Sequence, residues 1–219
     1  SSWHSFKILS SEFKTAIQDY TDNAETTFVS QLDRFILNSE ERILKECQLD
    51  VFRRNVEGSA ATGNKFLTKP DDFLASFSLS VVNSSSNEFL LNKHVTFIQD
   101  FTPNPATTGV PQYYADFSDT AFILAPTPDS NYTMELHYFY RPTSITASSD
   151  GTSWLGTNAE LALLYGALVE AYTFMKGDAD LLSLYNNRFM ESIQWLKILG
   201  EGRQTRDEYS YDEVRKDIP

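Results

Sequence analysis

The chain has 219 residues, enough for one large domain or for a domain with a sizeable insertion. Thirty acidic residues against 18 basic residues give a formal charge of −12, which disfavours binding to a nucleic-acid backbone. The single cysteine, Cys47, excludes an intramolecular disulfide and a cysteine-based metal site. The sequence shows neither a secretory signal nor the roughly 20 apolar residues of a membrane span, so we expect a protein that is not exported and has no membrane partner.

Two amphipathic helices are expected in residues 1–50. Phe13, Ala16, Ile17 and Tyr20 recur at the spacing of one helix face, which predicts a short first helix. A longer apolar stripe predicts a second helix over about residues 25–49, with Cys47 on its buried side.

Residues 51–145 are predicted to form a β-rich module. Alternating apolar and polar residues separated by turn-forming segments predict strands at 73–82, 112–116, 120–124 and 132–140. Residues 95–101 have the spacing of one short helix. On the last strand Glu135, His137 and Phe139 share one face, because side chains alternate along a strand, and the other face is apolar.

Residues 146–200 are predicted to add two more helices. A capping box at Thr157–Glu160 opens the first, which ends at Gly177, and Asp178 or Asp180 opens the second, which ends at Gly200. Residues 201–219 hold no Leu, Phe or Ala and are highly charged, which predicts an extended arm that orders on a partner. The predicted fold is therefore α+β: a helical bundle from the N- and C-terminal helices, an inserted antiparallel β module and an extended C-terminal arm.

No catalytic, cofactor-binding or metal-binding residue is predicted. His4, His94 and His137 have no second ligand at metal-binding spacing, and we interpret Glu135 with His137 as a polar ladder rather than a catalytic pair. Cys47 is interpreted as a small buried side chain. The Asp71–Asp72 and Asp178–Asp180 pairs fit turn or helix-capping roles better than a metal loop.

Six stretches, in order along most of the chain from Phe28 to Leu199, resemble the head-to-tail adaptor (connector or tail tubular adaptor) family of tailed phages. They are residues 35–46 (FILNSEERILKE), 69–73 (KPDDF), 109–115 (GVPQYYA), 123–129 (ILAPTPD), 136–142 (LHYFYRP) and 154–171 (WLGTNAELALLYGALVEA).

The resemblance implies a structural virion protein of the neck or tail, assembled in the host cytoplasm. It implies a ring of twelve copies beneath the portal protein, which extends the DNA channel and presents a surface to the next tail protein, a nozzle or tube. DNA would pass through the channel without specific binding. In such a ring the helical bundle forms the annulus, the β insertion projects from it, and the C-terminal extension clasps the portal.

Within the arm we expect portal contacts, because Arg and Tyr are favoured interface anchors and a flexible arm can wrap a neighbour. The expected contact residues are Arg203, Arg206, Tyr209, Tyr211, Val214 and Ile218. His137 and Phe139 are expected to face a neighbouring subunit or the tail. Two other function classes compete: the β module of a tail or fibre component that binds host carbohydrate, and a small hydrolase of unrecognised type.

Overall fold

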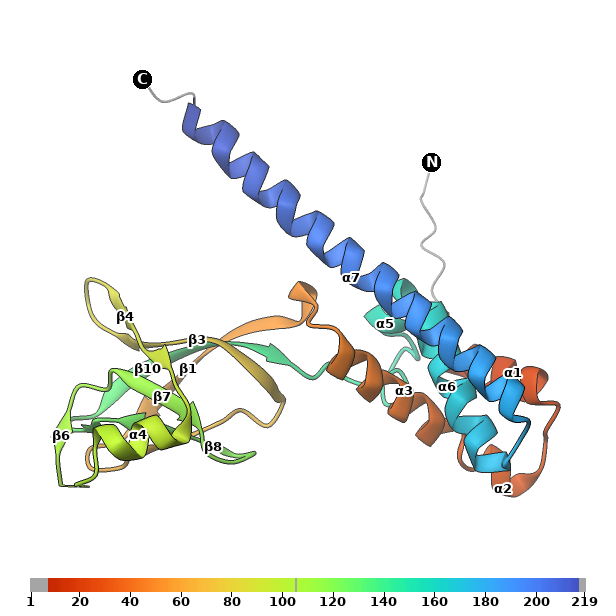
Figure 1. Ribbon diagram of the computed structural model, residues 1–219, viewed down its shortest axis with the longest axis horizontal. Coiled ribbons are helices and arrows are strands. Elements are labelled where there is room, and N and C mark those ends of the chain that lie inside the picture. The colour runs from red at the N-terminus through yellow and green to blue at the C-terminus, as the bar shows by residue number, and fades with distance from the viewer. Residues whose placement is uncertain (1–7, 105, 217–219) are drawn as a thin grey trace. The chain divides into compact units, whose positions relative to one another are not determined.

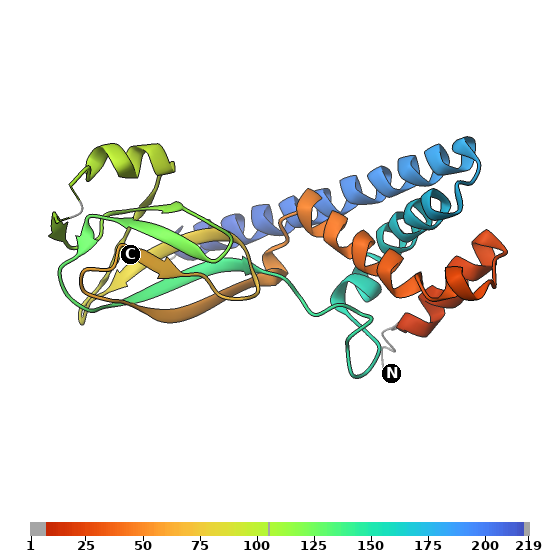
Figure 2. The same ribbon diagram turned by 90° about the horizontal axis from the view of Figure 1, so that it is seen from below.

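The computed structural model describes residues 8–104 and 106–216, and the side chains of these residues up to Leu199 (Figures 1 and 2). The chain divides into two compact units. A helical unit is built from the chain up to Leu49 and again from Thr143 onward, and a β unit spans Asp50–Pro142. The predicted α+β fold class, with helices at both ends and antiparallel strands between them, is confirmed.

The N-terminal part of the helical unit contains α1 (Ser10–Thr21), α2 (Thr26–Val29) and α3 (Leu32–Glu46). The predicted second helix is therefore interrupted near Ser30. The Ser30 hydroxyl donates to the carbonyl of Thr27 at 2.8 Å, and the Gln31 amide donates to the carbonyl of Phe28 at 2.9 Å. β-Branched residues and serine have only modest helix propensity, so this local turn competes well with a continuous helix.

The C-terminal part contains α5 (Trp154–Asn158), α6 (Glu160–Met175) and α7 (Ala179–Lys216). The predicted capping box is wrong, because Ser153 caps α5 through its hydroxyl, which accepts from the Gly156 amide at 3.0 Å. Thr157 lies inside that helix. The expected cap before α7 is confirmed: a carboxylate oxygen of Asp178 accepts from the Asp180 amide at 2.8 Å.

Helix α7 does not end at Gly200, and the expectation of an extended C-terminal arm is wrong for the residues that the structure describes. The helix continues to Lys216. A glycine in a helix costs only about 1 kcal/mol relative to alanine, and the residues after it are rich in Glu, Arg, Gln and Lys, which favour helix. The first proline after Gly200 is Pro219, beyond the described residues.

Helix α6 lies at the centre of the helical unit and packs against both α3 and α7. Gly166 makes this close approach possible. A β-carbon built at Gly166 would lie 2.2 Å from the hydroxyl of Ser39 on α3 and 3.0 Å from the ring of Phe189 on α7. The Ser39 hydroxyl donates to the carbonyl of Leu163 at 2.8 Å, so the two helices are also joined by a hydrogen bond.

The β unit holds two four-stranded sheets. Sheet A is antiparallel, in the order β1 (Arg53–Ala60), β10 (Tyr132–Tyr140), β3 (Phe73–Val82) and β4 (Asn87–Phe89). Sheet B has the order β2 (Phe66–Thr68), β8 (Ala121–Ala125), β7 (Tyr113–Asp116) and β5 (Leu91–Asn92). The strands β6 (Thr108–Gly109) and β9 (Thr127–Pro128) form a short parallel pair, and η1 (Asp50–Phe52) precedes β1.

The core of the β unit uses one face of each sheet. Leu79, Met134 and Leu136 of sheet A are buried in one cluster with Phe122 and Leu124 of sheet B. Helix α4 (Val95–Phe101) covers the other face of sheet B, where Ile98 packs against a second set of buried residues: Ala115, Ile123 and Ala125 (Figure 2). Most aromatic residues of the predicted strands therefore serve packing.

A buried carboxylate anchors the chain where it returns from the β unit to the helical unit. Glu40 on α3 is 7% exposed, and its Oε1 accepts from the Ser144 hydroxyl at 3.0 Å and from the Ile145 amide at 3.2 Å. Burial raises the pKa of this carboxyl group to about 7, although both hydrogen bonds favour the ionised form.

Candidate functional site

The most distinctive exposed surface of the β unit is the face of sheet A that does not contribute to the core. We call it the outer face of sheet A. Strand pairing places these side chains there: Arg53, Asn55, Glu57, Asn87, Phe89, Glu135, His137 and Phe139. Ring contacts with His137 and Phe139 place Phe77 on the same face. Both candidate contact residues of β10, His137 and Phe139, lie on this face.

An aromatic cluster occupies one part of the outer face. The ring of Phe77, 55% exposed, lies 4.9 Å from the ring of His137 and 6.4 Å from that of Phe139, measured between centroids. The Arg53 guanidinium lies 5.0 Å above the Phe77 ring, within range of a cation–π interaction. A large exposed aromatic side chain supported by arginine is typical of protein contact surfaces.

Sequence alternation alone does not identify Phe77 as part of this surface. It predicts a regular strand, but the register shifts between His137, opposite Ser78, and Tyr138, opposite Ser76. Phe77 lies between these two partners. Such a bulge re-aims a side chain, and only the pairing of β3 with β10 determines where it occurs.

The remainder of the outer face carries a polar ladder. Glu135 accepts hydrogen bonds from the side-chain amides of Asn55 at 2.5 Å and Asn87 at 2.8 Å. These two hydrogen bonds lower the pKa of Glu135. The carboxylate thus links β1, β10 and β4, as expected of a polar ladder, and the histidine two residues away contacts Phe77 instead.

Asp72 has a larger role than the predicted turn. Its Oδ1 accepts from the hydroxyl of buried Tyr138 at 2.7 Å, and its Oδ2 pairs with the Arg54 guanidinium at 2.6 Å. Arg54 also stacks on the ring of Tyr140, 3.9 Å from the centroid. Burial, and then the bond to Asp72, raise the pKa of Tyr138 to about 12, so its hydroxyl remains a donor at physiological pH.

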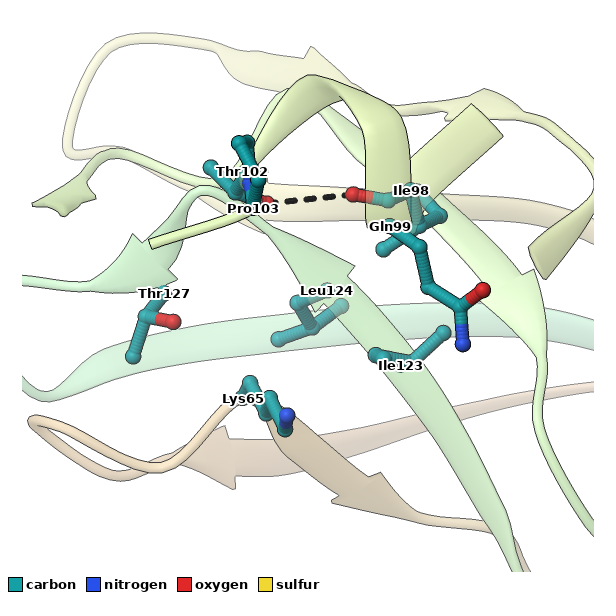
Figure 3. A pocket seen from close by; sticks show the side chains of 8 residues that line it. All are labelled: Lys65, Ile98, Gln99, Thr102, Pro103, Ile123, Leu124 and Thr127. Atoms are coloured by element: carbon teal, nitrogen blue, oxygen red, sulfur yellow. Dashed lines mark hydrogen bonds between the residues drawn. The ribbon is translucent and has the colours of Figure 1, made fainter. Parts of the chain in front are cut away.

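A pocket of about 310 Å³ lies beside α4 (Figure 3). Ile98, Ile123 and Leu124 supply apolar walls, and Lys65, Gln99 and Thr127 contribute polar groups. None of the residues that line it is aromatic, so it offers no stacking platform for a sugar ring. The arrangement contains no acid–base pair.

The other candidates for chemistry have structural roles. The Nδ1 atom of His94 accepts from the Thr96 amide at 3.2 Å and caps α4. Cys47 is buried, and burial raises the pKa of its thiol, which lowers its reactivity. His4 lies outside the described residues. Across residues 8–104 and 106–216 no three His, Cys, Asp or Glu side chains gather as metal ligands.

Comparison with protein families gives one decisive match: the family model described as SU10 adaptor protein aligns with residues 10–216. The chain belongs to this family of phage adaptor proteins. The resemblance to head-to-tail adaptors seen in the sequence is thereby confirmed. Such proteins are structural components of the virion and contact other head or tail proteins.

No curated protein matches the chain. Within its described part, no helix of this adaptor is long and apolar enough to cross a bilayer.

The adaptor also exposes apolar side chains along α7, which we call the α7 stripe: Leu181, Leu184, Trp195, Ile198 and Leu199. At 3.6 residues per turn these five positions fall on one side of the helix. Phe189, Ile193 and Leu196, which are buried, occupy another side. Trp195 is 64% exposed and is the largest side chain of the stripe. Sequence periodicity predicts Leu181, Leu184 and Leu199 on the buried side together with Phe189, Ile193 and Leu196, but these three leucines are exposed.

Of the six arm residues expected to contact the portal, five lie on the backbone of α7: Arg203, Arg206, Tyr209, Tyr211 and Val214. Their side chains, and all of Ile218, lie outside what the structure describes. At 3.6 residues per turn these five positions spread over somewhat more than half of the helix circumference, which is wider than a single contact stripe.

Proposed function

We propose that this adaptor forms a ring of twelve copies beneath the portal, where it extends the DNA channel and offers a docking surface to the next tail protein. The observation that carries the proposal is the family match across residues 10–216. The formal charge of −12 suits a channel along which DNA passes without binding.

The α7 stripe supports contacts between copies of the helical unit. Apolar side chains as exposed as Trp195 and Leu199 are stabilised when a partner removes them from water, by about 25 cal/mol for each Å² buried. Aromatic residues at the centre of an interface contribute most of its binding energy. We therefore assign the stripe to the contact between neighbouring subunits.

Trp195→Glu is expected to weaken self-association at least about tenfold, because it places a charge in the middle of the stripe. The fold should remain, since most of the Trp195 side chain is in water. Mass photometry over a concentration series would measure the assembly. Gln194→Glu is the matched control, because it adds a negative charge at the next exposed position, and equal loss in both variants would contradict the assignment.

We propose that the segment after Gly200 binds the portal protein. The proposed contact residues are Arg203, Arg206, Tyr209, Tyr211, Val214 and Ile218. The helix there changes the expected mode of contact from an extended arm to a helix that lies in a groove or adds to a bundle. Deleting residues 201–219 should abolish stable attachment to portal rings.

The helical unit should survive this deletion, because Phe189, Ile193 and Leu196, which are buried on α7, all precede Gly200. Co-sedimentation with purified portal rings measures attachment, and circular dichroism verifies the fold. Alanine substitution of Arg203 and Arg206 alone provides a milder variant. If the truncated protein still co-sediments with portal rings, the segment is not the portal contact.

The outer face of sheet A is our candidate for contact with a neighbouring subunit or with the tail. His137 and Phe139, from which this contact is expected, lie on the face, and Phe77 and Arg53 extend it. Electron microscopy of the purified complex would determine which component covers this face and would count the copies in the ring.

A further inference from the structure

Sheet A has two edges whose outer sides form no strand pairing within the described residues. β1 pairs with β10 along eight residues, and β4 pairs with β3 along three, each on one side only. Seven of the eight β1 residues and all of β4 are exposed. Unpaired backbone donors and acceptors on such an edge can accept a further strand.

The shorter edge also carries an apolar side chain in water. Phe89 on β4 is 67% exposed, more than any other large apolar side chain in the described part of the chain. It lies opposite Ser80, which places it on the outer face of sheet A. A strand added to this open edge would remove part of the Phe89 ring from water, as well as pairing the free backbone groups of β4.

The strand order makes the two edges complementary. The four strands of sheet A alternate in direction, so β1 and β4 run in opposite directions. When a second copy continues the sheet head to tail, its β4 meets β1 in the antiparallel sense. A contact between two different edges is heterologous, which is the kind of contact that closes a ring.

We propose that β4 of one copy adds to β1 of the next, with Glu88 opposite Arg54. This inference rests on the proposed ring and names one of its contacts. Glu88 lies opposite Val81 on the core side, the side that Arg54 also occupies opposite Tyr138, so the pair joins opposite charges. Arg54 is already bonded to Asp72, and its planar guanidinium has further donors.

The same register places Phe89 opposite Arg53 on the outer face. Arg53 already lies over the ring of Phe77, so Phe89 would extend the aromatic cluster across the subunit boundary. Asn87 would lie opposite Asn55. A shift by one residue would turn Phe89 toward the core side, and a shift by two would place Glu88 opposite Val56, without a charge partner.

Three residue pairs bury less than the roughly 800 Å² per partner of a stable interface. The strand pairing therefore fixes the orientation of neighbouring β units, while the α7 stripe supplies most of the association. Cross-linking, which detects whether two residues lie close together, therefore tests the strand pairing better than a measurement of binding affinity does.

The test places cysteines at Asn55 and Asn87 of the full chain, with Cys47→Ala to remove the native thiol. Within one chain β10 and β3 separate these positions by three strand spacings, roughly 14 Å, which is beyond the roughly 7 Å limit of a disulfide. Between paired copies they are directly opposite. Under mild oxidation we expect a ladder of covalent multimers on a denaturing gel, from the adaptor alone or co-expressed with its portal protein.

Cysteines at Glu57 and Asn87 are the matched control, because they are two residues out of register and should give several-fold less product. Glu88→Arg in the cross-linking variant should also lower the yield several-fold. Rings that form without the ladder, or a stronger ladder from the shifted pair, would overturn the strand pairing and leave the ring proposal standing. No association with or without portal would overturn both.

Discussion

Replacing Glu40 with glutamine should make the protein more stable than the wild type at about pH 8, by about 3 kcal/mol, and should change its stability little at about pH 4. The effect is large because Glu40 is 7% exposed and burial raises the pKa of its carboxyl group from 4.5 to about 7. The carboxylate must therefore ionise in a poorly hydrated site.

The direction in which stability changes with pH follows from proton binding to Glu40 in the folded and unfolded states. Between pH 4.5 and about 7 the folded state holds a proton on Glu40 that the unfolded state has released. Stability from this group is complete below pH 4.5 and is lost as the pH rises through about 7. Glutamine is neutral throughout, and its carbonyl oxygen can still accept from the Ser144 hydroxyl and the Ile145 amide.

Urea unfolding of both proteins at several pH values would measure the difference. The free energies of unfolding of wild type and variant should diverge as the pH increases from about 5 to about 8. Glu46→Gln, an exposed change on the same helix, controls for the loss of one charge. Parallel curves for wild type and Glu40→Gln would show that the buried carboxyl group does not control the pH response.

Gly166→Ala should destabilise the helical unit by about 2 kcal/mol, although alanine favours helix by about 1 kcal/mol. The added methyl group would lie 2.2 Å from the Ser39 hydroxyl, so either that hydroxyl abandons the Leu163 carbonyl or α3 and α6 move apart. Either outcome loosens the packing of α3 and α6 around Gly166, which also contacts the Phe189 ring.

Ser39→Ala together with Gly166→Ala should recover part of this loss, because it removes the hydroxyl that the methyl group meets. Gly58→Ala is the matched control, since a β-carbon there has no heavy atom within 4 Å. Thermal unfolding of the three variants gives the comparison. A Gly166→Ala protein as stable as the wild type would mean that the three helices do not meet as closely as described.

Sequence patterns correctly predicted those elements in which the local periodicity and the packing of the folded protein favour the same structure. The strand at residues 73–82, the helix at 95–101 and the strand at 132–140 occur where periodicity places them. Helix ends were harder to predict. Gly200 resembles a stop, yet it lies within α7, and Ser153 rather than Thr157 caps a helix, because several residues near each end had similar capping chemistry.

The candidate contact surface was predicted only in part, for a physical reason. His137 and Phe139 share a face because strands alternate, and this can be read from one segment. Phe77 joins them through a bulge, and Glu40 meets Ser144 across about a hundred residues of sequence. Neither contact leaves a local pattern, since both depend on which segments pair.

The β unit enters and leaves the chain at neighbouring positions: Arg53 at the start of β1 is paired with Phe139 near the end of β10. Residues paired in this way are roughly 5 Å apart. The whole β unit can therefore be inserted at a single point in the chain of the helical unit. Residues 50–142 can therefore be exchanged as one cassette while the helical scaffold remains intact.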